Sequence, residues 1–283
     1  MFLDILRKNG YESFEAVNGA EAFSQIPTIK PDLIISDIQM PVMDGFELFQ
    51  KVEESFPSIK RVLVTGYNID EYISHIRTYN VGNILVKNAE VRIDEIASYL
   101  DSLLTGDIFG LKRYFPDTQI HTGCISDNES AQQLCTDIVE SYGAADQIYL
   151  EMAINEIINN AVYHGVLKCS DIPREEWVQS YKLSDCENGI KYSWARDAEK
   201  IGISIEDPSG NLKKTDVLKW LDHKVKEKNN NEDEHGRGFL LIRKIIDRFI
   251  INIAPSQRTE CILLQYINRT SHRGNKPLLI HEI

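Results

Sequence analysis

The sequence predicts an α/β fold at the N-terminus, built on a doubly wound parallel sheet, followed by a second domain. A length of 283 residues suits two domains. The first third of the chain carries three short apolar runs, at Pro31–Asp37, Arg61–Gly66 and Asn83–Asn88, separated by helical patterns. Continuous apolar runs are typical of buried parallel strands, and their alternation with helices indicates a doubly wound sheet.

Each of these runs carries a polar residue at its carboxyl end, where the chemistry of such sheets lies. These residues are Asp37, Thr65 and Lys87, and Met40-Pro41 and Met43-Asp44-Gly45 follow Asp37. A carboxylate beside a hydroxyl and an ammonium suits acceptance of a phosphoryl group, whose oxygens the other two groups would contact. Three unrelated strand-end residues are the alternative, which the spacing after Asp37 disfavours.

This segment resembles the receiver domain of two-component response regulators, a flavodoxin-like fold, over residues 1–104. On this resemblance Asp37 is the phosphoacceptor, Thr65 the switch hydroxyl and Lys87 the phosphate-contacting lysine. Asn88 stands where the family usually has proline. The resemblance implies an upstream sensor histidine kinase as a partner.

The receiver pattern lacks its first strand. Receivers begin with a strand whose acidic pair holds Mg²⁺, whereas this chain starts within the following helix, MFLDILRKNG. In the strand order 2-1-3-4-5 the missing strand is central, so its loss leaves unpaired backbone groups inside the sheet. Asp4 is the only acid near the start, and it lies on the helix. We therefore expect either that the natural protein starts upstream or that another segment fills the gap.

We predict that this chain takes up phosphate at Asp37 poorly, because it has no acidic pair to hold Mg²⁺. Adding an upstream strand with that pair should raise labelling by acetyl phosphate. Equal labelling with and without the added strand would refute this expectation.

The first motif of the second domain is a row of polar residues on a predicted helix over residues 150–165. The apolar residues repeat at i, i+3, i+4 and i+7, and Glu156, Asn160 and His164 follow one another at i+4 beside them. A carboxylate and a carboxamide stacked in this way suit a bound water and a divalent cation. The alternative is the polar flank of an ordinary amphipathic helix.

Two glycine-containing motifs follow this helix. Ile203–Asn211 predicts a strand that ends in Asp207 and a turn that carries Gly210. Gly236–Phe249 predicts a Gly-flanked loop that opens an amphipathic helix, where backbone N–H groups and the helix N-terminus favour a phosphate. Each motif is common alone, and their order along the chain is the more specific signal.

This order resembles the Bergerat ATP-binding fold of the GHKL superfamily, an α+β architecture forming an α/β sandwich, over residues 117–270. Within the superfamily the chain is most similar to the anti-sigma-factor serine kinases. The resemblance implies ATP and Mg²⁺ as ligands. It makes Glu156 the catalytic general base, Asn160 the Mg²⁺ ligand and Asp207 the acceptor of the adenine amino group.

The resemblance also implies the remaining nucleotide contacts. Gly210 would let the base approach closely, and Thr259 matches the Gly-Thr segment of the family. The residues that would border the phosphates are Gly236, Arg237 and Gly238. The chain departs from the family in two places, because the turn 207–211, DPSGN, has one clear glycine and 258–260, RTE, replaces Gly-Thr. These departures bear on turnover more than on nucleotide binding.

Composition favours a cytoplasmic regulator. Acidic residues outnumber basic residues 43 to 31, and the resulting net charge of −12 disfavours nucleic acid as the main partner. Five scattered cysteines without a CxxC pair indicate reduced thiols and no metal site. Neither a long apolar run nor a signal peptide is present, so we expect no membrane partner.

Three connecting segments remain. Residues 105–116 are the predicted linker, short enough that we expect the two domains to touch. Its apolar residues are candidates for that contact or for packing within one domain: Ile108, Phe109, Leu111, Tyr114 and Phe115. Lys224–Gly236, charged and rich in asparagine, matches the ATP lid of the family or an ordinary solvated loop. Ser271–Ile283 is expected to be a loosely attached tail.

Three functions fit these signatures. The first is a phosphorylation-controlled serine/threonine kinase that uses ATP and Mg²⁺ on a STAS-type anti-anti-sigma factor, with a sigma factor as a further partner and homodimerisation left open. The second is a non-catalytic nucleotide-binding partner switch. The third is a histidine kinase with a fused receiver, which needs a phosphoacceptor histidine on a helix before residue 150. His121 lies in a strand-like context, which ranks this function last.

Overall fold

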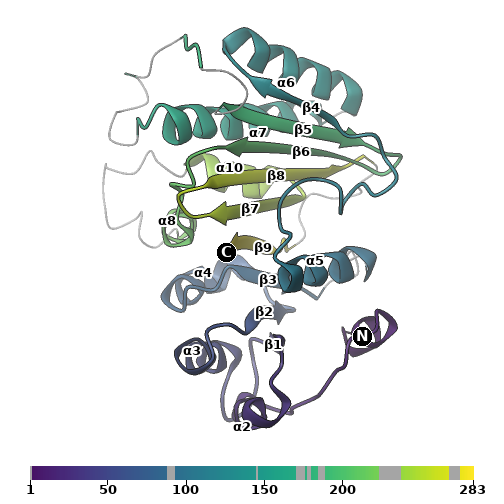
Figure 1. The fold of residues 1–283 in the computed structure, drawn as a ribbon, viewed down its shortest axis with the longest axis vertical. Helices are drawn as coiled ribbons and strands as arrows, with labels where there is room; N and C mark the ends of the chain where they lie inside the picture. The colour runs from purple at the N-terminus through teal and green to yellow at the C-terminus, as the bar shows by residue number, and fades with distance from the viewer. Residues whose placement is uncertain are drawn as a thin grey trace. The chain divides into compact units, whose positions relative to one another are not determined.

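The computed structural model divides the chain into two compact units (Figure 1). The first comprises Met1–Ile108 with Asn275–Leu278, and the second comprises Phe109–Gly274 with Leu279–Ile283. The residues that the structure describes are 2–87, 93–144, 146–169, 176, 180–183, 189–222, 237–267 and 275–283. The predicted ATP lid and Gly236 lie outside them.

The first unit is built on the three predicted runs, which form parallel strands in the order β1-β2-β3. Their bounds are Leu33–Asp37, Lys60–Thr65 and Asn83–Val86. Five helices accompany them in the described part of this unit: α1 Phe2–Lys8, α2 Gly19–Ile29, α3 Gly45–Ser55, α4 Ile69–Thr78 and α5 Ile93–Thr105. The strand ends therefore meet at one edge of a parallel sheet, as the sequence predicts.

The start of α3 holds the end of β1 in place. Asp44 caps the helix, because its side chain accepts from the Glu47 N–H at 2.9 Å while the Glu47 side chain accepts from the Asp44 N–H. A Cβ atom at Gly45 would collide with the carbonyl oxygen of Asp37. Only glycine therefore lets the helix begin this close to the strand end, and Asp37 is fixed as a result.

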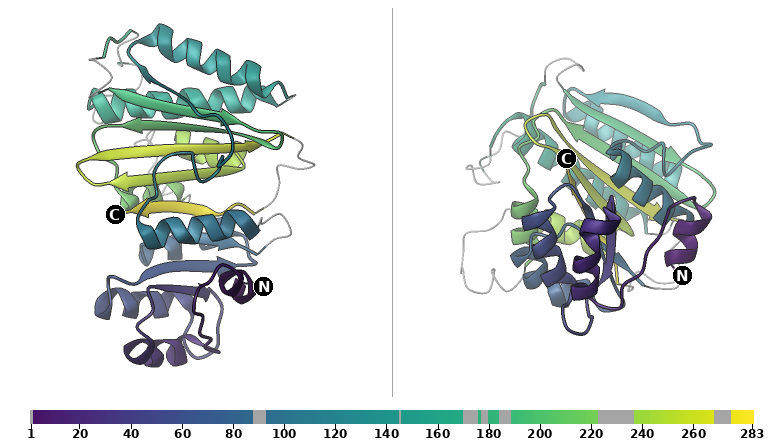
Figure 2. Two further views of the ribbon diagram at one scale, coloured as in Figure 1. Left: turned by 45° about the vertical axis from the view of Figure 1, so that its right-hand side comes forward. Right: turned by 60° about the horizontal axis from the view of Figure 1, so that its bottom comes forward.

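The second unit pairs one sheet with one layer of helices. Its strand order is β9-β7-β8-β6-β5-β4, antiparallel except for the parallel pair β7 and β9. The strands are β4 His121–Ile125, β5 Ile190–Arg196, β6 Lys200–Asp207, β7 Arg248–Ala254, β8 Arg258–Tyr266 and β9 Leu278–Glu282. The helices lie on one side of this sheet (Figures 1 and 2). They are α6 Asn128–Tyr142, α7 Gln147–Asn159, α8 Lys214–Leu221 and α10 Arg237–Ile245.

Strand register decides which residues face the helices. Asp207 lies opposite Thr259 across β6 and β8, so the two side chains share a face of the sheet. Gly165, which follows α7, touches the Asp207 side chain, so this face is the helix-covered one. Gly202 on the other face abuts the Phe115 ring, so Phe115 packs within the second unit.

Three predictions of secondary structure are corrected by the structure. The helix predicted over 150–165 is α-helical only to Asn159, and a π-helix, η1, spans Asn160–Val166. The helix predicted through Phe249 ends at Ile245, because Arg248–Ala254 extends as β7 beside β8. The tail is not loose at its end, because Leu278–Glu282 forms β9 and its apolar side chains are buried against the sheet.

Cys124 corrects the expectation of uniformly reduced thiols. It is disulfide-bonded, whereas Cys135, Cys169 and Cys261 are free. Two of the free thiols, Cys135 and Cys261, are buried, and burial raises the pKa of the Cys135 thiol to about 11. These two cysteines act as apolar packing residues.

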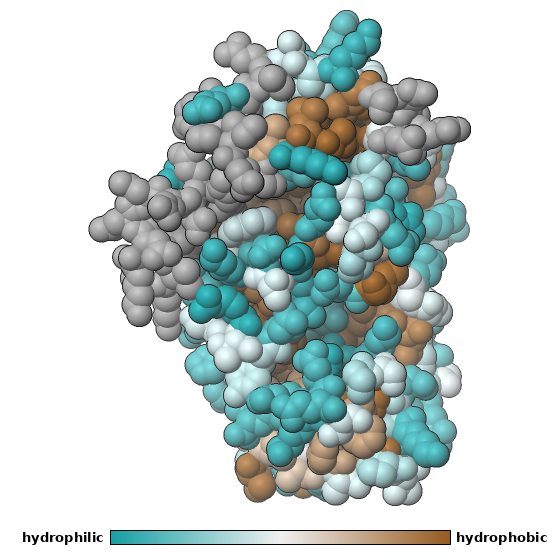
Figure 3. Space-filling model, turned by 60° about the vertical axis from the view of Figure 1, so that its left-hand side comes forward, coloured by the Kyte–Doolittle hydropathy of each residue, from teal (hydrophilic) through white to brown (hydrophobic). Residues whose placement is uncertain are grey.

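None of the helices in the described part of the chain combines membrane-spanning length with sufficient hydropathy. The face in Figure 3 is mostly hydrophilic, with apolar patches between the polar side chains.

We predict that His281 makes the stability of the protein fall on acidification. Burial lowers the pKa of His281 to about 3, with the Arg113 guanidinium acting in the same direction, whereas an unfolded histidine titrates near 6.5. In this pH range His281 therefore binds a proton in the unfolded chain and stays neutral in the folded chain. The free energy of unfolding should fall by about 1 kcal/mol per pH unit through this group as the pH drops below about 6.5.

Denaturant titrations between pH 8 and pH 5.5 test this with the His281→Gln variant, which should show a shallower loss of stability. Measurements at pH 8, where the histidine is neutral in both states, report the packing cost of the substitution alone. Parallel pH profiles for the variant and the parent would show that His281 is not the responsible group.

Candidate functional site

Asp37 and Lys87 meet at the carboxyl edge of the first sheet. The Lys87 ammonium lies 2.6 Å from Oδ2 of Asp37, and both side chains are partly open to solvent. The Lys87 N–H donates to the Thr65 carbonyl at 2.7 Å, which fixes the lysine beside the end of β2. The structure thus brings together the acid and the ammonium that the sequence predicts for a phosphoryl acceptor.

Thr65 lies at the same edge but turns its hydroxyl toward the following loop. The side chain is fully buried, and Oγ1 accepts from the Tyr67 N–H at 2.9 Å. Asn275 joins this loop from the far end of the sequence: its Nδ2 donates to the Tyr67 carbonyl, and its Oδ1 accepts from the Ile69 N–H at 3.1 Å. The loop after the predicted switch residue is therefore held from two sides.

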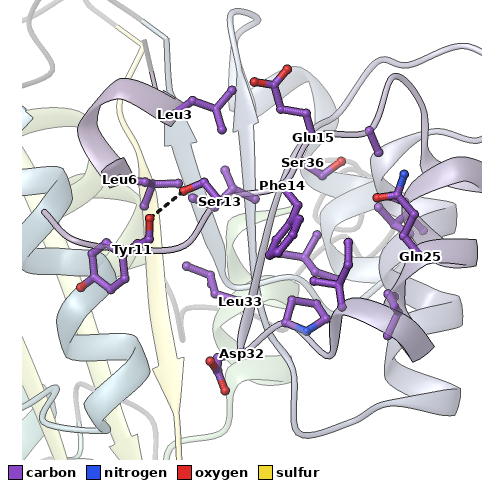
Figure 4. A pocket seen from close by; sticks show the side chains of 18 of the residues that line it. Leu3, Leu6, Tyr11, Ser13, Phe14, Glu15, Gln25, Asp32, Leu33 and Ser36 are labelled. Carbon is purple, nitrogen blue, oxygen red and sulfur yellow. Dashed lines mark hydrogen bonds between the residues drawn. The ribbon is translucent and has the colours of Figure 1, made fainter. Parts of the chain in front are cut away.

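A groove of about 560 Å³ follows β1 in the first unit (Figure 4). Leu3 and Leu6 of α1, Phe14 of the irregular segment after it, and Leu33 of β1 line this groove. Asp37 and Lys87 line it too. The groove lies where the sequence predicts a missing strand, and among the described residues of this unit β1 pairs only with β2.

In the second unit, α7 and α10 bring Glu156 and Gly238 into contact. A Cβ atom at Gly238 would collide with the Glu156 carboxylate, so only glycine lets the start of α10 approach this side chain. Glu156 is half-buried, Gly238 is buried and Arg237 is exposed at the first position of α10. The polar helix and the start of the glycine-bordered helix, predicted to lie on either side of a triphosphate, therefore face each other.

Asp207 is a buried carboxylate at the end of β6. It is only 8% exposed, and burial raises the pKa of Asp207 although hydrogen bonds from Ser209 and Gly210 oppose the shift. Its Oδ1 accepts from the Ser209 N–H at 2.9 Å and from the Ser209 hydroxyl at 2.5 Å. A carboxylate withdrawn from water in this way acts as a hydrogen-bond acceptor with a fixed direction.

The Asp207 turn requires glycine at position 210. Gly210 has φ of +57°, and a Cβ atom there would lie 2.6 Å from the Gln257 amide nitrogen and 2.7 Å from that of Ser256. The Ser256 N–H donates to the Gly210 carbonyl at 3.1 Å. Gly210 thus closes the turn onto the β7–β8 hairpin, and the single glycine of DPSGN occupies the position where the backbone needs one.

Thr259 adds an unsatisfied hydroxyl beside Asp207. The residue is 4% exposed, and among the described residues its Oγ1 has no hydrogen-bond partner. A buried hydroxyl without a partner costs free energy that a bound polar ligand can recover. A buried acceptor paired with such a hydroxyl fits a flat heterocycle that carries an amino group, and this observation supports the adenine assignment.

Asn160 carries a carboxamide oxygen one helical turn beyond Glu156, and its N–H donates to the Glu156 carbonyl. It is half-buried at the first position of η1, four residues after Glu156. A carboxamide oxygen beside a carboxylate suits Mg²⁺, which prefers hard oxygen ligands and retains several waters. The residues present therefore fit a nucleotide held as its magnesium complex.

Glu260 explains one departure from the family pattern. It is 2% exposed on the opposite face of the sheet from Asp207. The carboxylate accepts from the Gly110 N–H at 2.9 Å, the Ser204 hydroxyl at 2.5 Å and the Asn252 side chain at 2.8 Å. Glu260 therefore anchors the segment that enters this unit, and burial raises the pKa of Glu260.

Two residues that contact Asp207 were not predicted from the sequence. Ser209 holds the Asp207 carboxylate, and Gly165 lies directly against it. The Asp-Pro-Ser order signals the first, because aspartate commonly bonds to the backbone two residues on. No local signal identifies Gly165, because its contact with Asp207 depends on the packing of η1 against β6.

Two family comparisons match separate parts of the chain. The response regulator receiver domain matches residues 2–100, and the histidine kinase-like ATPase domain matches residues 128–265. The chain therefore carries a receiver domain fused to a histidine kinase-like ATPase domain, as the two resemblances predict at this level.

Curated relatives share part of their length with this chain. The uncharacterized transcriptional regulatory protein YesN of Bacillus subtilis (strain 168) is 33% identical over 90 residues, which is 32% of this chain and 24% of YesN. Sporulation initiation phosphotransferase F of the same organism is 31% identical over 64 residues, 23% of this chain and 52% of that protein. The chain thus matches about a quarter to a half of the length of these relatives.

Solved structures with local similarity include receiver proteins. A CheY-like receiver domain protein from Methanospirillum hungatei JF-1 is 26% identical, covering 37% of this chain and 82% of that chain with a TM-score of 0.34. The receiver domain of a histidine kinase from Syntrophus aciditrophicus is 27% identical, covering 38% and 83% with the same TM-score.

Proposed function

We propose that this protein is a response regulator whose output domain binds ATP with Mg²⁺ and acts as a serine/threonine kinase in a partner switch. The buried pair Asp207 and Thr259 carries this proposal, because it offers a fixed acceptor and an unsatisfied hydroxyl at one strand end. The apposition of Glu156 and Gly238 supports it by placing a carboxylate at the start of α10.

The roles of the chain's own residues follow from this arrangement. Asp207 orients the base, Asn160 holds the cation and Glu156 takes the proton of the attacking hydroxyl. Bound Mg²⁺ would supply charge neutralisation for the phosphates. Arg237, exposed at the first position of α10, would balance phosphate charge together with the helix N-terminus.

The proposed partners follow from the resemblance. The substrate would be a STAS-type anti-anti-sigma factor, and the output domain would also hold a sigma factor, in the cytoplasm. Asp37 would receive phosphate from a sensor histidine kinase, with Thr65 and Lys87 responding to it. The Asp37–Lys87 ion pair at 2.6 Å supports this part, because the ammonium already lies where a phosphoryl oxygen would need it.

A non-catalytic switch is the second candidate. The close packing of Gly238 on Glu156 favours it, because the carboxylate must keep room for an attacking hydroxyl to act as a base. In this case nucleotide binding alone would control the affinity for the partner.

We expect ATP with Mg²⁺ to stabilise the protein, because a ligand that binds only the folded state adds its binding free energy. At 100-fold excess over Kd the gain is about 2.7 kcal/mol. Calorimetry or urea unfolding with ATP, with and without Mg²⁺, measures it. The Asn160→Ala variant should lose the Mg²⁺-dependent part, whereas Asn128→Ala, at the start of α6, should retain it. No stabilisation of the parent protein by ATP would rule out both candidates.

We expect Glu156→Gln to bind ATP normally and to lose transfer to the STAS substrate by about 100-fold or more, because the amide cannot take a proton. Phosphate transfer from labelled ATP measures the rate, and titration measures the affinity. Glu151→Gln is the matched control, an exposed glutamate on the same helix. A parent protein that binds ATP without transfer would favour the non-catalytic switch, and undiminished transfer by Glu156→Gln would remove Glu156 from the mechanism.

A further inference from the structure

The π-helix after α7 changes which residue lies one turn beyond Asn160. In an α-helix this would be His164, four residues on, whereas π-helical bonding spans five residues. The Leu167 N–H donates to the Val162 carbonyl at 2.8 Å, which is such a five-residue bond. Gly165 rather than His164 therefore falls below Asn160, and π-turns of this kind recur at functional sites.

Gly165 touches the Asp207 carboxylate directly. A Cβ atom at Gly165 would lie 2.7 Å from Cγ, 2.8 Å from Cβ and 3.0 Å from Oδ1 of Asp207. The distances to Cγ and Cβ are shorter than real contacts of a Cβ atom allow, and both residues are buried. The backbone of η1 thus forms a wall against one side of the carboxylate.

Ser209 confines the same carboxylate through hydrogen bonds. Its N–H and hydroxyl both donate to Oδ1 of Asp207, at 2.9 Å and 2.5 Å. Burial also removes the water that would otherwise let the carboxylate rotate freely. The direction in which Asp207 accepts a hydrogen bond is therefore set by a wall of backbone and a pair of donors.

We propose that Gly165 is a positioning residue that sets the base selectivity of the nucleotide site. Because Gly165 has no side chain, the π-turn can pack its backbone directly against Asp207. This contact holds the carboxylate in the orientation that accepts an amino group from the base. The same turn starts at Asn160, so the cation ligand and the base acceptor are placed by one backbone element. This inference rests on the proposed binding of ATP.

The chemistry of the purine gives a selective readout. Adenine presents a donor amino group at the position where hypoxanthine presents an acceptor oxygen, so a correctly aimed carboxylate favours ATP over ITP. Loss of a hydrogen bond in a site built for it costs large factors in selectivity. A side chain with a purely structural role would change both affinities together.

The Gly165→Ala variant tests the proposal, because its methyl group would displace Asp207. ATP binding should weaken by about tenfold or more, and the ratio of ATP to ITP affinity should fall toward one. Gly202→Ala is the matched control: it crowds the Phe115 ring from the other face of β6 and should leave the ratio unchanged. An unchanged ratio in Gly165→Ala would overturn the proposal.

Amide hydrogen exchange separates this inference from the proposed function, because it needs no nucleotide. The Ser209 amide bonds to Asp207, so its exchange should accelerate in Gly165→Ala and not in Gly202→Ala. Unaltered protection of Ser209 in Gly165→Ala would overturn the positioning role. Failure of the parent protein to bind ATP, with Ser209 exchange accelerated in Gly165→Ala, would instead overturn the proposed function and the base selectivity with it, while the positioning of Asp207 by Gly165 would stand.

A double-mutant cycle covers the case in which Gly165→Ala does not fold. Asp207→Gly removes the atoms that the new methyl group would strike, because glycine lacks the Cβ, Cγ and Oδ1 atoms. Combining the two substitutions should therefore restore folding, with strong non-additivity in the free energy of unfolding. If Gly165→Ala is as damaging with Asp207→Gly as without it, the contact is not the cause and the proposal fails.

Discussion

The second unit depends on a carboxylate that is buried without a charged partner among its described hydrogen bonds. Asp207 lies at the end of β6, where burial penalises its charge, and the bonds from Ser209 recover only part of that cost. Such a group persists because the surrounding backbone holds it. Gly210 closes the turn that follows Asp207, and Gly165 packs against the side of the carboxylate. Ser209, Gly210 and Gly165 therefore all hold the same hydrogen-bond acceptor.

The second buried carboxylate of this unit differs from the candidate site residue Asp207 in its hydrogen bonding. Glu260 on the opposite face is satisfied by Gly110, Ser204 and Asn252, and therefore has a structural role. Asp207 instead lies across from Thr259, whose hydroxyl has no partner within the described part of the chain. Burial alone does not distinguish the two carboxylates, whereas the remaining hydrogen-bonding capacity beside them does.

The candidate carboxylate of the first unit differs from Asp207 in both pairing and exposure. Asp37 and Lys87 are paired but remain open to solvent, at 36% and 43% side-chain exposure. The proposed role of Asp37 as a phosphoryl acceptor needs this accessibility, because the donor must reach the carboxylate from outside. The fold achieves it by ending three parallel strands at one edge, with Gly45 and the capped start of α3 holding β1.

The sequence by itself determined the parallel strands and their polar ends, because continuous apolar runs and their alternation with helical patterns are local features of the chain. It also identified Glu156, Asp207 and Gly210 as candidates, since a polar helical row and a turn glycine leave local signals. The tertiary structure decided that β9 completes the second sheet and that Asn160 begins a π-turn that places Gly165 on Asp207. Those outcomes depend on packing between segments far apart in the chain, which a local pattern does not encode.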